Sequence, residues 1–189
     1  MNFLGHAAVA RHHDDDPAYV LGAVLPDLLP MAGLRLDRSA VGPQVAAGWR
    51  DHHRVDAAFH ASADFTQGVR ALHADLHPLE RGPRRAVAHV GWELLLDEVV
   101  ADDADTLVAF RAALEAGRDL HPDAGWHRLL DRLAAGPFVE VALRVHRTVG
   151  RRPRLAFDAE LVPLVADVLE RHRPTVARVG PGLVAALSR

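Results

Sequence analysis

Ionisable side chains recur every four residues in two stretches that otherwise have the composition of buried helix. Each stripe combines histidine with carboxylate residues: His52, Asp56 and His60 in the first, and His89, Glu93 and Asp97 in the second. Residues four apart lie on one face of a helix. Burying such groups is costly unless they are paired, and one divalent metal ion can pair with several of them at once. The two stripes therefore predict a metal site.

The second stripe lies in the more apolar stretch, residues 86–101, which read AVAHVGWELLLDEVVA. Its only titratable residues are His89, Glu93, Asp97 and Glu98. A helix that is apolar nearly all round is a core helix. We expect His89 and Glu93 to act together in a site, the alternative for His89 being a hydrogen-bonded core histidine. For Asp97, a salt bridge at the end of the helix is an equally good interpretation.

The first stripe has the spacing of a helix face that points into the core. His52 and Asp56 alternate with Trp49 and Phe59 at steps of three and four residues, where apolar side chains are expected. A His and an Asp four apart can reach one ion, because their Cβ atoms are roughly 6 Å apart. The alternative is a buried His–Asp hydrogen bond that only fixes packing. His60 is a further candidate for proton transfer.

Two other residues join the candidates. His6 is the only titratable residue in the apolar face of the first predicted helix, and Asp27 follows an apolar helix, residues 18–25, that we expect Pro26 to end. Taken alone, His6 is compatible with a core histidine and Asp27 with a turn or cap. Mixed histidine and carboxylate ligands from several helices are typical of Mn, Fe or Zn hydrolases, whereas shells of oxygen alone favour Mg or Ca.

The elements that must position these residues are helices. No stretch alternates convincingly with a period of two, so strands are not expected. Helices over residues 39–61 and 82–102 carry the two stripes, and helices over 158–172 and 175–187 close the chain. A chain of 189 residues that is 49% hydrophobic can bury a single core. We predict an all-α fold with one compact multi-helix domain, residues 1–189.

The composition of the chain excludes several kinds of site and partner. The formal net charge of −3 gives no overall field that would favour nucleic acid. The absence of cysteine excludes disulfides and thiolate zinc sites, and fits a reducing compartment. No signal peptide and no apolar stretch long enough for a bilayer is visible. We therefore predict a cytoplasmic protein that binds neither membrane nor nucleic acid.

A basic turn lies in the C-terminal half of the chain. Residues 150–155 read GRRPRL and contain Arg151, Arg152 and Arg154. Guanidinium groups present a planar fork of donors to phosphate or carboxylate oxygens. The turn could therefore bind a phosphate group or an acidic partner, and an exposed basic turn without a ligand is an equally good interpretation.

Four motifs resemble one known family. MNFLGH at residues 1–6 is similar to the opening of the acyl carrier protein phosphodiesterase family, and HHRVD at residues 52–56 is similar to its His-Arg-x-Ile-Asp motif. GAVLPD at residues 22–27 and the GRRPRL turn resemble further segments, and all four follow the order of the family.

The resemblance implies a helical fold distantly related to the HD-type metal phosphohydrolases. It also implies Mn-dependent hydrolysis that releases phosphopantetheine from acyl carrier protein. Residue by residue, the family's site carries over to His6, Asp27, His52 and Asp56.

The chain departs from the family in the second stripe. Where the family has a stretch similar to Asp-Val-Met-Trp-Asp-His, residues 89–94 read HVGWEL. The acidic positions become His89 and Glu93, and the histidine becomes Leu94. These residues can still bind a metal, but the substrate does not follow from the resemblance.

Together these observations predict a metal-dependent phosphohydrolase or phosphodiesterase that uses metal-activated water. The expected metal is Mn, with Fe, Zn or Mg as alternatives, and the substrate is a phosphorylated small molecule or a phosphopantetheinyl carrier protein. Asp56, His60 or Asp97 would transfer protons and Arg152 would neutralise phosphate. The predicted metal ligands are His6, Asp27, His52, Asp56, His89 and Glu93. One alternative is a non-catalytic metal-binding or interaction module, and another is a helical protein in which these residues only pair with each other.

Overall fold

The computed structural model describes residues 1–136 and 141–189, and within them it is built from α-helices without a β-strand. The predicted all-α class is confirmed. The helices are α1 (Phe3–His13), α2 (Pro17–Ala32), α3 (Pro43–Ala61), α4 (Ala63–Asp75), α5 (Arg81–Ala101), α6 (Ala104–Ala116), α7 (Ala124–Ala135), α8 (Val141–Gly150) and α9 (Val162–Leu187). Between them, the described residues also form the 3-10 turns η1 (Arg38–Ala40), η2 (Arg118–Leu120), η3 (Pro153–Leu155) and η4 (Ala159–Leu161).

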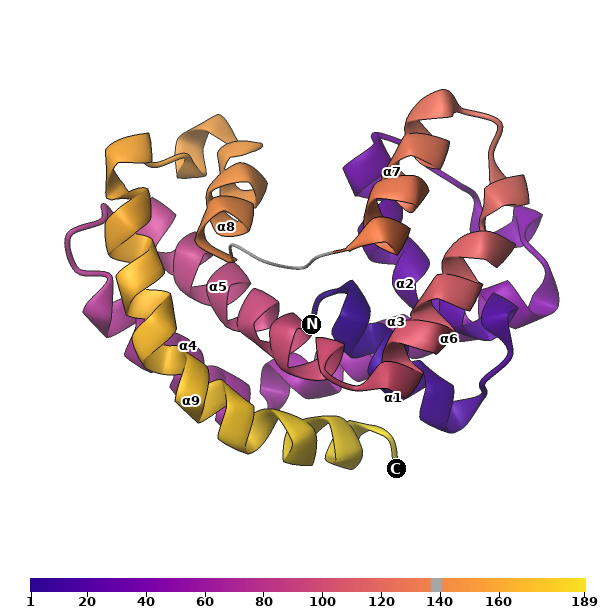
Figure 1. Ribbon diagram of the computed structural model, residues 1–189, viewed down its shortest axis with the longest axis horizontal. Coiled ribbons are helices and arrows are strands. Elements are labelled where there is room, and N and C mark those ends of the chain that lie inside the picture. Colours follow the sequence, from indigo (N-terminus) through magenta and orange to yellow (C-terminus); the bar gives the residue numbers. More distant parts are fainter. Residues whose placement is uncertain (137–140) are drawn as a thin grey trace.

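Helix α5 runs through the middle of the molecule (Figure 1). It packs against α1, α4, α6, α8 and α9, so nearly every side of it meets another helix. This explains its apolar sequence: Trp92, Leu95 and Leu96 are each at most 1% exposed. Helices α1, α2, α3, α6 and α7 lie toward one end of α5, and α4 and α8 lie toward the other (Figure 1). Helix α9 runs along α5 and reaches α1 and α3 as well.

Helices α2 and α3 approach each other at two glycines. A Cβ atom on Gly22 would lie 2.1 Å from the carbonyl oxygen of Val45, and one on Gly48 would lie 1.9 Å from the carbonyl oxygen of Tyr19. Real side chains do not tolerate such distances, so only glycine permits this contact between backbones. The close approach brings His52, one turn beyond Gly48, against α2.

The prediction that Pro26 ends the second helix is wrong. Helix α2 continues to Ala32 with Pro26 and Pro30 inside it. A proline inside a helix removes one hydrogen bond, but Leu25 and Leu28 are completely buried and continue the apolar face of the helix past Pro26. Burial therefore outweighs the local preference, and Asp27 lies within the helix rather than in a turn.

The predicted break near residue 174 is wrong for the same reason. Helix α9 is continuous and contains Pro174 and Pro181. Leu169 and Val176, on either side of Pro174, are at most 2% exposed, so one apolar face crosses the proline. The sequence also predicts a helix over residues 138–149. Its residues 138–140 lie outside the described residues, and the described helix α8 spans Val141–Gly150. Within the described ranges, no helix has the length and apolar character that crossing a bilayer requires.

Candidate metal centre

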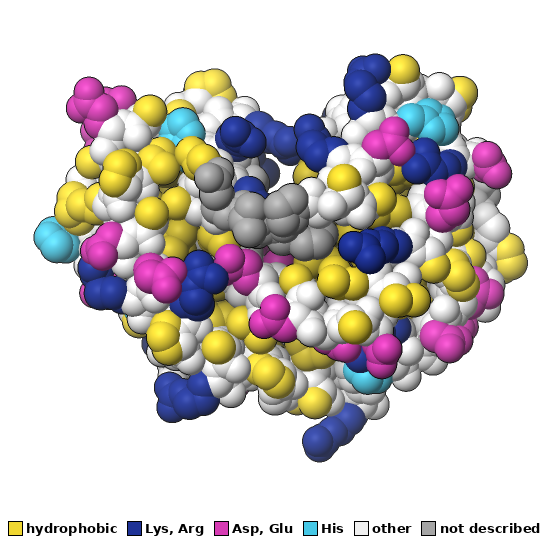
Figure 2. Space-filling view, viewed as in Figure 1, with side chains coloured by type: hydrophobic (Ala, Val, Ile, Leu, Met, Phe, Trp, Pro, Cys, Tyr) yellow, Lys and Arg dark blue, Asp and Glu magenta, His cyan; other side chains and the backbone are white. Residues whose placement is uncertain are grey.

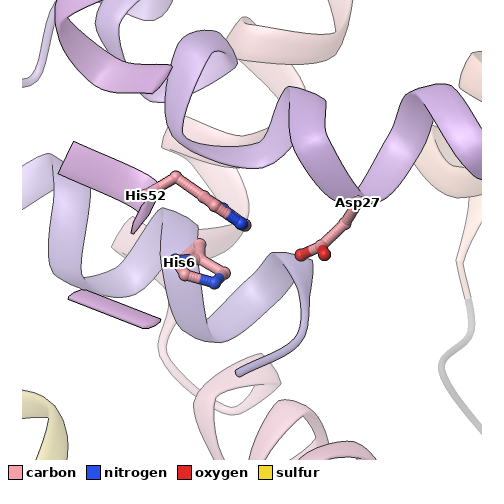
Figure 3. A group of neighbouring side chains, drawn as sticks. All are labelled: His6, Asp27 and His52. Carbon is pink, nitrogen blue, oxygen red and sulfur yellow. The ribbon is translucent and has the colours of Figure 1, made fainter. Parts of the chain in front are cut away.

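Three of the predicted ligands come together from three different helices. His6 lies on α1, Asp27 on α2 and His52 on α3, and one potential ligand atom of each lies within 4.8 Å of the other two. Figure 3 shows the two imidazole rings and the carboxylate turned toward a shared space. The two rings are also stacked, with centroids 3.9 Å apart. We call these three residues the inner group.

His52 has the orientation of a metal ligand. It is 7% exposed, and its Nδ1 lies 2.8 Å from the carbonyl oxygen of Ala23. Because a carbonyl can only accept, Nδ1 carries the proton and Nε2 keeps its lone pair. Burial lowers the pKa of His52 to about 3, so the ring is neutral at physiological pH. A neutral imidazole whose second nitrogen is fixed by a backbone oxygen is the usual form of a histidine that binds metal.

His6 and Asp27 contribute buried polar atoms without partners. Neither His6 Nε2 nor Asp27 Oδ2 has a hydrogen-bond partner among the described residues. The Oδ1 of Asp56 lies 3.6 Å from His6 Nε2, too far for a hydrogen bond. Burial lowers the pKa of His6 and raises the pKa of Asp27 well above its ordinary value. Such unpaired atoms are rare in folded proteins, and a cation bound between them would pair with both.

Two more predicted ligands, His89 and Glu93, lie in a second, adjoining group together with His60, which was predicted for proton transfer. His60 Nε2 and His89 Nε2 lie 3.1 and 3.2 Å from Glu93 Oε1, and one potential ligand atom of each residue lies within 4.8 Å of the other two. We call His60, His89 and Glu93 the outer group. Their side chains are 31%, 42% and 15% exposed, respectively.

Asp56 connects the two groups. Its Oδ1 lies 3.6 Å from His6 Nε2, and its Oδ2 lies 3.1 Å from Nδ1 of His60. Contacts with the carboxylates of Asp56 and Glu93 raise the pKa of His60 to about 9, so His60 is protonated at neutral pH. Burial alone would raise the pKa of Glu93, but hydrogen bonds from His60 and His89 lower it.

The α-ammonium group of Met1 also lies in this network. It donates to Asp56 Oδ1 at 2.7 Å and to Glu93 Oε1 at 3.1 Å. Burial would lower the pKa of this amine, but the carboxylates of Glu93 and Asp56 outweigh it and raise the pKa. Sequence reasoning missed this group because methionine is apolar and the charge belongs to the backbone.

Asp97 joins neither group. It is completely buried, and its Oδ1 accepts a hydrogen bond of 3.1 Å from the backbone N–H of Gly5. Its Oδ2 lies 3.7 Å from a guanidinium nitrogen of Arg144. Gly5 is in the first turn of α1, where amide groups have no partner within the helix. Asp97 therefore caps α1 and fixes the backbone next to His6.

Arg152 lies apart from both groups. With Arg151 and Arg154 it lines a surface pocket around η3, which packs against the start of α5. All three residues are exposed, and none forms an ion pair with another described residue. Figure 2 shows arginine side chains around a hollow between the two upper lobes of this face. The turn is available to an anion, but no hydrogen bond or ion pair among the described residues connects it to the inner or the outer group.

Comparison with protein-family models, curated proteins and solved structures finds no match to this chain. The relation to acyl carrier protein phosphodiesterases, and to HD-type hydrolases, therefore stays a prediction. What the structure contributes is the geometry of two groups of potential metal ligands, and functional inference rests on them.

Proposed function

We propose that this protein is a metal-dependent phosphohydrolase or phosphodiesterase with its metal held by the inner group. The observation that carries the proposal is the convergence of His6, Asp27 and His52 in a buried space, with potential ligand atoms that lack other partners. Burying polar groups without partners costs free energy, so their presence here indicates that they bind something. Asp56 lies beside His6 and is a further ligand candidate.

The donor set favours a transition metal. Two imidazoles and a carboxylate suit Mn, Fe or Zn better than Mg or Ca, which prefer oxygen ligands alone. Among these, Mn agrees with the family that the motifs resemble. When bound, such a cation supplies Lewis acidity toward a phosphoryl oxygen and activates water as the nucleophile.

The surrounding residues have roles that their positions support. His60 holds a proton between Asp56 and Glu93 and is 31% exposed. As long as no cation occupies the outer group, His60 can deliver that proton to a leaving group on the solvent side. Arg152 and its neighbours on the exposed turn would bind an anionic part of the substrate. The substrate would be a phosphorylated small molecule or a phosphopantetheinyl carrier protein, and the site of action the cytoplasm.

One observation favours a non-catalytic alternative. The ammonium group of Met1 and the protonated His60 already neutralise Asp56 and Glu93 without any ion. A non-catalytic metal-binding or interaction module could therefore keep these charged residues without catalysing a reaction. The structural alternative, in which the residues only pair with each other, describes His60, His89 and Glu93. It does not describe the inner group, where His52 bonds to the backbone of Ala23 and the buried atoms His6 Nε2 and Asp27 Oδ2 have no hydrogen-bond partner among the described residues.

The test combines metal analysis, stability and turnover. Protein purified without added metal is analysed for bound transition metals, and its thermal unfolding is followed with and without Mn²⁺. At one hundred times the dissociation constant, an ion stabilises the fold by about 2.7 kcal/mol, which for a chain of this size is roughly 5–10 °C in Tm. We expect this gain, and Mn²⁺-stimulated hydrolysis of bis(p-nitrophenyl) phosphate, to disappear in His52→Ala and to survive in His77→Ala, a change at an exposed histidine. Stabilisation without hydrolysis would favour the binding module, and the absence of both would reject a metal site.

A further inference from the structure

We infer that the outer group is a second metal site, distinct from the inner one, with His60 Nε2, His89 Nε2 and Glu93 Oε1 as its ligands. The two imidazole nitrogens lie 3.1 and 3.2 Å from the same carboxylate oxygen. Ligands bound to one ion at about 2.0–2.2 Å lie roughly 3–3.5 Å apart, so these separations suit a shared ion. The two rings stack with centroids 4.9 Å apart, which keeps both nitrogens on the same side as Glu93.

His60 is oriented as a ligand by its other nitrogen. Nδ1 lies 3.1 Å from Asp56 Oδ2, while Nε2 is the atom that faces Glu93. A carboxylate that holds one ring nitrogen fixes the ring and increases the basicity of the other nitrogen. Ala23 does the same for His52 in the inner group. Both groups therefore contain a histidine with one nitrogen fixed by an oxygen and the other turned to its ligand partners.

Exposure distinguishes the two sites. In the inner group, His6 and His52 are 1% and 7% exposed. In the outer group, His60 and His89 are 31% and 42% exposed. Three protein ligands at a solvent-facing position leave coordination positions open, as in catalytic rather than structural metal sites. The outer site would thus exchange its ion with solvent and could contact a bound ligand directly.

The charges already present predict that the outer site is the weaker one. Glu93 Oε1 also accepts a hydrogen bond from the Met1 ammonium at 3.1 Å. An entering cation must compete with this ammonium group for Glu93 Oε1, whereas His6 Nε2 and Asp27 Oδ2 have no hydrogen-bond partner among the described residues. Two imidazoles and one carboxylate again suit Co²⁺, Zn²⁺, Fe²⁺ or Mn²⁺.

Co²⁺ is a suitable probe because elemental analysis gives the number of bound ions and visible absorption reports their coordination. Full-length wild-type protein is dialysed against increasing Co²⁺, bound metal is measured by elemental analysis, and visible absorption reports the ligand field. We expect about two ions per chain at saturation, the second binding more weakly, as in two-metal sites. His89→Ala should lose the weaker ion and its absorption band and keep the tighter ion, while His52→Ala should lose the tighter one.

His77→Ala, at an exposed histidine outside both groups, is the matched control and should bind as the wild type does. Because His89 is 42% exposed, its replacement leaves the core intact, and circular dichroism checks this. A single ion in the wild type, or an unchanged count in His89→Ala, would overturn the second site. Equal losses in His89→Ala and His77→Ala would also overturn it, because they would indicate unspecific surface binding. A chain that binds one ion and hydrolyses phosphate esters would overturn this inference and leave the proposed function intact.

Discussion

Asp97 makes the stability of this protein depend on pH in a direction opposite to that of an ordinary ion-paired carboxylate. The side chain is completely buried beside the first turn of α1. Burial raises its pKa from an ordinary 3.8 to about 7, despite the nearby guanidinium of Arg144. The folded protein therefore binds this proton more tightly than the unfolded chain does. By linkage, the contribution of Asp97 to the free energy of unfolding falls as the pH rises from about 4 to about 7, and is constant above that range.

The substitution Asp97→Asn removes this dependence and keeps the geometry. The amide oxygen can still accept the hydrogen bond from Gly5, but the side chain cannot ionise. The difference between a pKa of about 7 and one of 3.8 corresponds to about 4 kcal/mol. Relative to the wild type, the variant should gain up to this amount of stability between pH 4 and pH 8.

Urea unfolding followed by circular dichroism at several pH values measures this difference directly. Asp119→Asn, at an exposed carboxylate, is the matched control and should track the wild type at every pH. The reasoning is refuted if wild type and Asp97→Asn differ by a constant amount across the range. A difference that grows in favour of the wild type as the pH rises would refute it too, because it would show that the pairing with Arg144 outweighs burial.

Three further substitutions test the packing and the site. Asp27→Asn should stabilise the metal-free protein, because burial raises the pKa of Asp27 and disfavours its charge; metal binding, followed by calorimetry, should be lost in the same variant. Gly48→Ala should destabilise the fold by about 1–3 kcal/mol or more in urea unfolding, since the added Cβ meets the carbonyl oxygen of Tyr19. Gly182→Ala, in α9 with nothing within 4 Å of the new Cβ, should instead stabilise it by about 0.5–1 kcal/mol; equal effects of the two alanines would contradict the packing described for α2 and α3.

Much of the fold follows from the sequence because its helices are long and strongly apolar. The stripe of residues 86–101 predicted a core helix, and α5 is surrounded on nearly every side. The errors fall at Pro26 and Pro174, where a local rule was applied without knowledge of the packing. The free energy that a proline costs inside a helix is a local quantity. The free energy gained by burying the apolar side chains on either side of it depends on which other helices pack there. A short stretch of sequence does not show how deeply its side chains will be buried.

The site was predictable as a set of residues but not as an arrangement. His52 could be named because an ionisable residue at an apolar position is unusual, and Asp27 because it matches the family that the motifs resemble. The structure brings both together with His6. Spacing along one helix suggested that His52 and Asp56 share a partner, and both lie beside His6. Spacing did not indicate their other contacts, which are Ala23 on α2 for His52 and His60 for Asp56. Which neighbour a side chain meets depends on how helices cross, and for α2 and α3 that crossing is set by glycines that carry no chemical signal.

The first turn of α1 is where the fold and the proposed chemistry depend on each other. The positive end of this helix meets three carboxylates from two other helices: the Met1 ammonium bonds to Asp56 and Glu93, and the N–H of Gly5 bonds to Asp97. Acidic groups at a helix N-terminus stabilise it, so these contacts hold α1 in place and with it His6. Asp56 and Glu93 are also the carboxylates that a bound cation would share. A metal entering either group would therefore redistribute the same negative charge that anchors α1, and metal binding and the position of this helix should be coupled.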